Sequence, residues 1–143
     1  SSDSSGSMTA IYTVLAEGDD QQDPIADAAR AILDGHVVLS RDLAERGHYP
    51  AIDIGASISR VMPNIVSEQQ LKSCYSLKRL YSRYQQVQEL IPLGAYQAGK
   101  DSELDRAVAL YPKIEQFLCQ GLNEQVNFSQ TEQQLATLVA QHA

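Results

Sequence analysis

The sequence lacks the features that mark membrane-spanning, secreted and metal-binding proteins. No run of about 18 apolar residues occurs, which excludes a transmembrane helix of ordinary length. No secretory signal is visible. Cys74 and Cys119 are the two cysteines and lack a metal-ligand spacing. They are therefore interpreted as reduced core thiols of a cytosolic protein.

Basic residues are also scarce. The chain has 11 Lys and Arg against 18 Asp and Glu, a net charge of −7, so general nucleic-acid binding is not expected. Residues 1–66 hold ten acids and four bases (−6), and residues 67–143 hold eight acids and seven bases (−1). One acid-free stretch contains four bases: Lys72, Lys78, Arg79 and Arg83. A solvated helix face is the simpler interpretation, and a surface for an acidic protein partner is the alternative.

The groups that usually hold the phosphates of ATP are absent. No G-x-x-x-x-G-K-[ST] loop occurs, and no apolar strand ends in an aspartate that would organise Mg²⁺. Asp19 and Asp20 are adjacent but lack the rest of a calcium-loop pattern, so they are interpreted as solvent-facing. The sequence predicts no metal site.

The first part of the chain is predicted to be α/β. Asp23 and Pro24 are typical of a helix start, and Gly35 is expected to end this helix in a left-handed conformation. The expected elements are a flexible segment over residues 1–7, a buried strand over 8–15, an acidic loop over 17–22, a helix over 23–33, a strand over 36–40 and a short helix over 42–46 ending at Gly47. This alternation predicts an α/β unit with parallel strand pairing.

After Pro63 the pattern becomes helical throughout. Apolar residues recur at helical spacing from Ser67, a candidate cap, to Ile91. The next helix is expected to begin at Asp101 or Ser102, to be broken or kinked at Pro112, and to stop by Gly121. Ser129 and Glu132 predict a capping box for the last helix. The fold class is therefore α/β followed by all-α.

Two residues between these parts suggest a nucleotide site. Pro50 biases Tyr49 toward an extended backbone, so its ring is held out from the chain and could stack on a base. Arg60 follows small residues that let another surface approach it, and its guanidinium matches phosphate oxygens. A packed turn and a surface salt bridge are the simpler alternatives. His36 and His48 are interpreted as hydrogen-bonded turn residues, because no nucleophile or ligand set accompanies them.

Three dense motifs in one order carry a family resemblance. They are EGDD at 17–20 with DPIAD at 23–27, ILDGHVVLSR at 32–41, and GHYPAIDIGASISR at 47–60. From about residue 8 to 128 the chain resembles the C-terminal part of the catalytic domain of flagellar and type III secretion export ATPases, relatives of the catalytic subunits of F-type ATP synthases. The sequences QQDP at 21–24 and LGAY at 93–96 are more similar to the flagellar branch than to the virulence branch.

The resemblance implies a domain organisation and a set of site residues. Residues 8–62 would be the last strands and helices of a RecA-like P-loop NTPase domain, and residues 63–143 a C-terminal helical domain, with 1–7 a flexible segment or remnant. Tyr49 matches the aromatic that stacks on adenine in its own subunit, and Phe128 a second aromatic of that pocket. Leu122 stands where ATP synthase relatives often have an aromatic. Arg60 matches the arginine finger that reaches the neighbouring subunit's phosphates.

The resemblance also implies what the full-length enzyme does. It would hydrolyse ATP with Mg²⁺ as a homohexamer, in the cytoplasm at the inner-membrane export apparatus. Its implied partners are linker proteins resembling a peripheral stalk, central-stalk-like proteins, export chaperones and substrates, and the export gate. This chain alone resembles an excised piece, because phosphate-binding groups are absent. It is expected to be inactive, to bind no cofactor tightly, and to be altered, swapped or dimerised before residue 62.

Two alternatives remain open at this point. The chain could belong to the virulence branch, whose chemistry is the same. Alternatively, residues 67–143 could be a non-catalytic module that docks a stalk, linker or chaperone partner. In that case Arg60 would be structural, and changes at Lys78, Arg79 or Arg83 would abolish partner binding.

Overall fold

The computed structural model describes Gly6, residues 8–15 and residues 23–141. The chain divides into two compact units, Ser1–Leu33 and Asp34–Ala143. The expected acidic loop and, apart from Gly6, the expected flexible segment lie outside the described residues. None of the described helices is long and apolar enough to cross a membrane.

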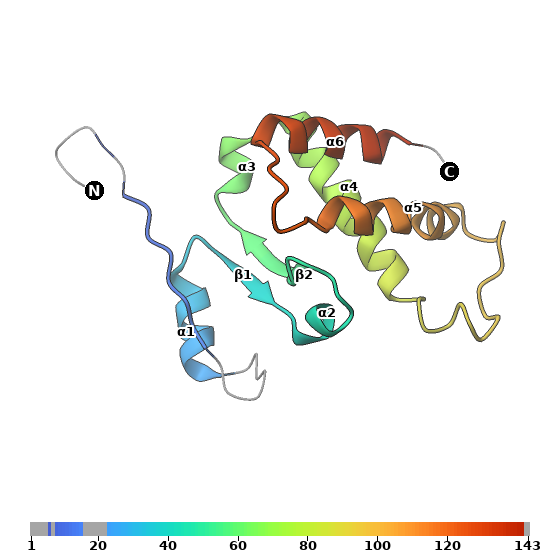
Figure 1. Cartoon of the computed structure of the whole chain (residues 1–143), viewed down its shortest axis with the longest axis horizontal. Coiled ribbons are helices and arrows are strands. Elements are labelled where there is room, and N and C mark those ends of the chain that lie inside the picture. The colour runs from blue at the N-terminus through green and yellow to red at the C-terminus, as the bar shows by residue number, and fades with distance from the viewer. Residues whose placement is uncertain (1–5, 7, 16–22, 142–143) are drawn as a thin grey trace. The chain divides into compact units, whose positions relative to one another are not determined.

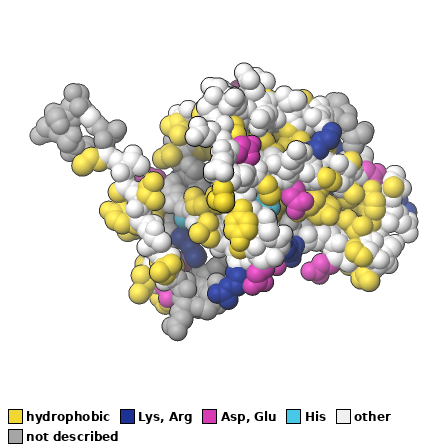
Figure 2. Space-filling view, in the orientation of Figure 1, with side chains coloured by type: hydrophobic (Ala, Val, Ile, Leu, Met, Phe, Trp, Pro, Cys, Tyr) yellow, Lys and Arg dark blue, Asp and Glu magenta, His cyan; other side chains and the backbone are white. Residues whose placement is uncertain are grey.

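The strand predicted over residues 8–15 is not formed. This segment has no regular secondary structure, and Met8, Ile11 and Leu15 are each more than 90% exposed. Hydrophobic side chains accordingly lie on the surface of the N-terminal unit, at the left of Figure 2. A strand needs a neighbour that satisfies its backbone N–H and C=O groups, and the described residues of this unit include no other strand.

Helix α1 spans Pro24–Ile32 and begins as predicted. The Asp23 carboxylate accepts hydrogen bonds from the N–H groups of Ile25 and Ala26 at 2.8 and 2.9 Å. These bonds satisfy two of the donors left open at a helix N-terminus. Gly35 does not end this helix, so that prediction is wrong; the helix is capped at Leu33.

The second unit begins with two antiparallel strands, β1 (Gly35–Leu39) and β2 (Ile52–Ser59). The parallel pairing predicted for strands over 8–15 and 36–40 is wrong because residues 8–15 form no strand, and β2 itself was not anticipated. The connection contains only the five-residue helix α2 (Arg41–Glu45). A helix of that length rises about 8 Å. It cannot carry the chain back along β1, whose end Cα atoms lie about 13 Å apart.

A large bulge interrupts β2. Ser59 pairs with Gly35 and Ile58 with His36, whereas Asp53 pairs with Val38. Residues 54–57 of β2 therefore stand opposite Val37 alone. Gly35 allows the two backbones to approach closely, because a Cβ there would lie 2.6 Å from the Ile58 carbonyl oxygen. The residue that was expected to stop a helix instead permits strand pairing.

Four helices follow the sheet, as Figure 1 shows: α3 (Met62–Ile65), α4 (Glu68–Gln85), α5 (Ser102–Leu118) and α6 (Phe128–Ala140). The core lies between α4, α5 and α6, and Leu80, Ala107 and Ile114 are at most 1% exposed. Ile54 of β2 packs against this core. The structure thus has a small sheet followed by helices, as the sequence predicts.

The helix boundaries differ from the predictions in three places. Helix α4 begins after the predicted cap, Ser67, but ends at Gln85 and gives way to a series of turns instead of continuing to Ile91. Helix α5 runs through Pro112 without a break. The capping box of α6 is formed by Asn127 and Gln130, since each side chain accepts from the other's backbone N–H. The box predicted at Ser129 and Glu132 is therefore wrong.

Candidate nucleotide site

The loop that carries Tyr49 follows α2. Gly47 has a φ of +77°, a left-handed conformation that favours glycine, and turns the chain out of the short helix. The next residue, His48, is 7% exposed, whereas the side chain of Tyr49 is 57% exposed. The peptide bond from Tyr49 to Pro50 is cis. The loop thus buries the imidazole and exposes the phenol ring.

Two consecutive contacts fasten this loop to the end of α5. The Gln120 N–H donates to the Tyr49 carbonyl at 2.8 Å. The Cys119 thiol lies 3.4 Å from His48 Nδ1. His48 is therefore a hydrogen-bonded turn residue as predicted, and His36 has a partner too, since its Nε2 lies 3.1 Å from the Ala56 carbonyl oxygen. Cys74 and Cys119 are both free and only half-buried.

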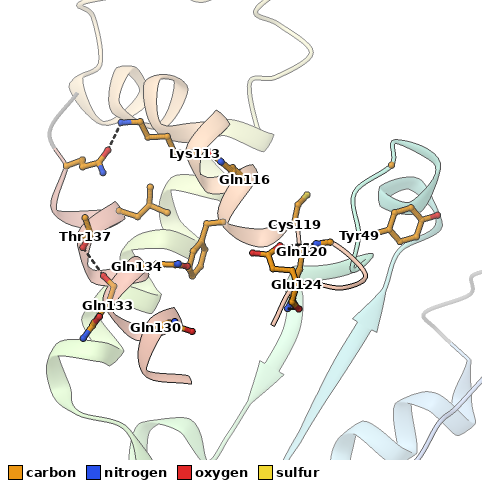
Figure 3. Close-up of a pocket in the computed structure, with 15 residues that line it drawn as sticks. Tyr49, Lys113, Gln116, Cys119, Gln120, Glu124, Gln130, Gln133, Gln134 and Thr137 are labelled. Carbon is orange, nitrogen blue, oxygen red and sulfur yellow. Dashed lines mark hydrogen bonds between the residues drawn. The ribbon is translucent and has the colours of Figure 1, made fainter. Parts of the chain in front are cut away.

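An open cavity of about 960 Å³ lies beside this loop and is bounded by α5 and α6. Tyr49 forms one rim, and Figure 3 shows its ring pointing away from Gln130 and Gln134 of α6. Its other lining residues are mainly polar: Lys113, Gln116, Gln120, Glu124, Gln133, Thr137 and Gln141 among them. Across it, Lys113 Nζ donates to Gln141 Oε1 at 2.6 Å.

The other two expected pocket residues do not line this cavity. Phe128 is the first residue of α6 and is 69% exposed. Leu122 is fully exposed, although its neighbour Gly121 is a lining residue. The structure brings Tyr49 next to residues 119–121, but it leaves Phe128 and Leu122 facing outward.

Arg60 lies at the other end of β2. It is exposed, it follows the last residue of the strand, and its backbone N–H donates to the Asp34 carbonyl at 2.8 Å. Tyr49 precedes the strand and Arg60 follows it. Because β2 pairs with the five-residue β1, its two ends are about 13 Å apart despite the bulge. The two candidate residues therefore face separate surroundings.

The four bases of α4 are used within the chain. Lys72 pairs with Glu68 at 2.6 Å on the exposed face of α4. Arg79 pairs with Glu103 at 2.8 Å, and Arg83 with Asp101 at 2.5 Å, both at the start of α5. Lys78 Nζ donates to the Ser57 carbonyl at 3.0 Å. The basic stretch therefore holds α4 to α5 and to β2.

Sequence reasoning missed a tyrosine stack between α4 and α5. The rings of Tyr84 and Tyr111 are stacked with centroids 3.6 Å apart, and Tyr81 lies 6.1 Å from Tyr111. Burial raises the pKa of Tyr111 to about 12, with the nearby Glu115 carboxylate adding to the effect. The helical spacing of these tyrosines was visible, but the pairing across two helices requires the tertiary structure.

No cluster of three or more His, Cys, Asp or Glu side chains that could hold a metal ion occurs in residues 8–15 and 23–141. Burial raises the pKa of the Cys74 thiol, which disfavours the thiolate that binds metals.

Two family models divide the chain. Residues 1–59 match the ATP synthase alpha/beta family, nucleotide-binding domain, and residues 66–137 match the T3SS EscN ATPase C-terminal domain. The flagellum-specific ATP synthase of Pseudomonas aeruginosa is 61% identical over 135 residues, which are 94% of this chain and 30% of that protein. The chain thus spans about a third or less of the relatives that it matches.

Solved structures agree with the family models. The assembled ATPase EscN from the type III secretion system of enteropathogenic E. coli has a TM-score of 0.90 and 46% identity, over 94% of this chain and 32% of that one. EscN in complex with its central stalk EscO gives 0.77 and 42%, over 81% and 29% respectively. The chain therefore belongs to the flagellum-specific and type III secretion ATPases and corresponds to the C-terminal part of such an enzyme.

Proposed function

We propose that this chain supplies an adenine-stacking aromatic and an arginine finger to the ATP-hydrolysing sites of a ring hexamer that energises flagellar protein export. Tyr49 serves the site of its own subunit, and Arg60 serves the site of the next. Because the chain spans about 30% of its flagellar relative, the activity belongs to the full-length enzyme.

The observation that carries the proposal is the placement of these residues at opposite ends of β2. Both are exposed, and both are anchored through backbone hydrogen bonds: the Tyr49 carbonyl to Gln120, and the Arg60 N–H to the Asp34 carbonyl. Anchored backbones with exposed side chains suit groups that act on a ligand outside the chain. Their separation fits two different nucleotide sites better than one.

Arg60 would act on the transition state. In phosphoryl transfer the protein mainly positions the groups and stabilises negative charge as it spreads over the equatorial oxygens. A guanidinium supplied by a neighbouring subunit contributes a factor on the order of 10³ to 10⁵ in rate. Arg60 suits this role because its planar donors match two oxygens at once.

Tyr49 would act on binding. An exposed ring offers a face to the adenine, and base stacking on an aromatic side chain contributes about 1 to 3 kcal/mol. Phe128 and Leu122, both exposed, are the proposed further contacts of the same pocket. The contacts with Cys119 and Gln120 hold the backbone from which the ring extends.

Phosphate and Mg²⁺ would be held by other parts of the enzyme. The sequence contains no phosphate-binding loop, and the described residues contain no cluster of metal ligands. ATP and Mg²⁺ are therefore expected as substrate and cofactor of the full-length enzyme, while this chain contributes Tyr49 and Arg60.

The flagellar branch is favoured over the virulence branch by degree of similarity. Identity is 61% to the flagellum-specific relative of P. aeruginosa and 52% to the type 3 secretion system ATPase of Pseudomonas savastanoi. By analogy with assembled EscN and its complex with a central stalk, we extend self-assembly and a central-stalk partner to this protein, and the family resemblance makes the proposed assembly a hexamer. Linker proteins, chaperones, export substrates, the export gate and attachment to the cytoplasmic face of the membrane are further parts of this proposal.

The docking-module alternative receives less support. It relies on Lys78, Arg79 and Arg83 as free cations for a partner. In the structure Arg79 and Arg83 pair with carboxylates of α5, and Lys78 donates to a backbone carbonyl of β2. Because these three side chains already have partners within the chain, the basic face is a weak argument for docking.

The test uses a chimera in which this chain replaces the matching part of the P. aeruginosa relative. Arg60→Ala should lower ATP turnover at least a hundredfold, with nucleotide affinity and hexamer assembly unchanged, because the lost interaction exists only in the transition state. Tyr49→Ala should instead weaken nucleotide affinity. Steady-state turnover, fluorescent nucleotide titration and mass measurement in solution give the three readouts.

The matched control is Arg79→Ala, which removes an exposed cation engaged with Glu103 and should leave turnover within about twofold. Retained turnover in the Arg60→Ala chimera would refute the arginine-finger assignment. Loss of stalk binding by Arg79→Ala, with turnover intact, would favour the docking module.

A further inference from the structure

The bulge in β2 leaves backbone groups without ladder partners, and side chains take their place. Asp53 Oδ1 accepts from the N–H groups of Gly55 and Ala56 at 2.8 and 2.9 Å. The Ser57 hydroxyl donates to the Asp53 carbonyl at 2.6 Å and accepts from the Val38 N–H at 3.0 Å. The bulge is therefore a defined structure and not a frayed strand.

A further side chain that bonds the backbone of the bulge comes from a distant helix. Lys78, 21 residues further along the chain, extends from α4 and donates to the Ser57 carbonyl at 3.0 Å. Its neighbours Lys72, Arg79 and Arg83 pair with carboxylates, whereas Lys78 donates to this backbone carbonyl. Lys78 lies in the region matched by the C-terminal domain model and Ser57 in the region matched by the nucleotide-binding model.

The residues between Ser57 and Arg60 are paired with β1, and Arg60 itself is bonded to Asp34. Ile58 pairs with His36 and Ser59 with Gly35, so the chain beyond the bulge returns to a regular ladder. The Arg60 N–H then donates to the Asp34 carbonyl at 2.8 Å. Arg60 is three residues from the carbonyl that Lys78 holds, and no flexible loop intervenes.

We infer that Lys78 is a positioning residue for Arg60, an inference that rests on the proposed function. Lys78 fixes the bulge against α4. Because Ile58 and Ser59 are paired with β1, the position of Ser57 in turn constrains the backbone of Arg60. The helical domain thereby sets where the guanidinium lies relative to the neighbouring subunit's phosphates. Misplacing a transition-state group by about 1 Å can cost on the order of a hundredfold in rate.

The test compares Lys78→Met, Lys78→Arg and Lys72→Met in the same full-length chimera. Methionine keeps the apolar stem of lysine and removes the donor, whereas arginine keeps a donor. Lys78→Met should lower kcat about ten- to hundredfold and leave nucleotide affinity unchanged, because Tyr49 is not involved. Lys78→Arg should recover most of the loss. Lys72→Met, which removes an exposed cation of the same helix, should have no effect.

Combination with Arg60→Ala separates positioning from other roles. If Lys78 acts through Arg60, Lys78→Met should lower turnover no further in the Arg60→Ala background, measured under single-turnover conditions. An equal loss in both backgrounds, or a normal kcat in Lys78→Met, would overturn the inference while the finger assignment stands. Full turnover in Arg60→Ala alone would instead refute the proposed function, and this inference with it.

Hydrogen exchange on the full-length chimera gives a second readout that does not depend on activity. The Arg60 amide should exchange at least tenfold faster in Lys78→Met than in Lys72→Met, because its bond to Asp34 lies at the end of the ladder that Lys78 fixes. An unchanged exchange rate at this amide would contradict the positioning role.

Discussion

At the scale of single residues, the polar contacts at element ends are the most specific feature of this chain. Asp101 accepts hydrogen bonds from the N–H groups of Glu103 and Leu104, both at 3.0 Å, and from Arg83 at 2.5 Å. One carboxylate therefore caps α5 and holds α4. The bond from the Leu104 N–H and then the bond from Arg83 keep the pKa of Asp101 below its usual value.

This lowered pKa predicts a pH dependence of folding. A carboxyl whose pKa is lower in the folded state contributes stability above the unfolded value of about 3.9, and loses it as the pH falls through the folded pKa. Asp101→Asn keeps a cap acceptor without the charge. The free energy of unfolding of the wild type should therefore exceed that of Asp101→Asn at neutral pH, and the difference should shrink under acid. Urea denaturation over a pH series measures it, and a pH-independent difference would contradict the prediction.

At the scale of elements, close backbone approach decides the geometry of the small sheet. Gly35 opposes Ser59 in the ladder, and a Cβ at Gly35 would meet the Ile58 carbonyl oxygen at 2.6 Å and the Ser59 Cα at 3.2 Å. Both are backbone atoms that cannot rotate away. Because Asp34 and the start of β1 also hold Arg60, the same approach fixes the end of β2.

Gly35→Ala should therefore destabilise the chain. Forcing a methyl group into a packed contact costs about 1 to 3 kcal/mol. Thermal or urea unfolding of the 143-residue chain measures the loss. Gly121→Ala is the matched control, since its nearest neighbour would be Glu124 Cβ at 3.8 Å and its φ is not positive. Equal stability of the two variants would show that the strands can separate without cost.

The bulge and the bases of α4 illustrate how elements are joined. Arg79 and Arg83 connect α4 to the start of α5, and Lys78 connects α4 to β2. Exposed ion pairs contribute little energy, typically below about 1 kcal/mol. The two ion pairs therefore join α4 to α5 without large stabilisation, whereas the Lys78 hydrogen bond is the contact that links α4 to the strand before Arg60.

At the scale of the whole molecule, the chain combines a packed helical part with an N-terminal part rich in exposed apolar residues. Helices α4, α5 and α6 share one buried core, while Met8, Ile11, Leu15 and Ile32 are each more than 80% exposed. Such surface is expected where a sheet of a larger nucleotide-binding domain would cover it. That cover belongs to the full-length enzyme of our proposal.

The 143-residue chain should not hydrolyse ATP above background, even with Mg²⁺, because its sequence has no phosphate-binding loop. A phosphate-release assay on the purified chain, beside the full-length chimera as positive control, measures this. Turnover that is lost on Arg60→Ala in the isolated chain would contradict the prediction and would mean that the chain contains a complete site.

Local chemistry allowed much of the secondary structure to be predicted. The predicted helix caps Asp23 and Ser67 are confirmed, and Asp101, one of two predicted starts, caps α5. Caps, like the left-handed glycine at Gly47, act within a few residues of the chain. Family-specific motifs likewise indicated the candidate residues Tyr49 and Arg60. Their roles stay predictions until the variants above are measured.

The amino-acid sequence was enough to predict most helix starts, the family and the candidate residues, because caps, periodicity and motifs are local. The strand β2, its antiparallel pairing and bulge, and the failure of residues 8–15 to form a strand were set by tertiary contacts. Each depends on which backbone groups find partners far along the chain. Lys78 shows the same principle: its charge was visible, but its contact with Ser57 exists only because α4 packs beside β2.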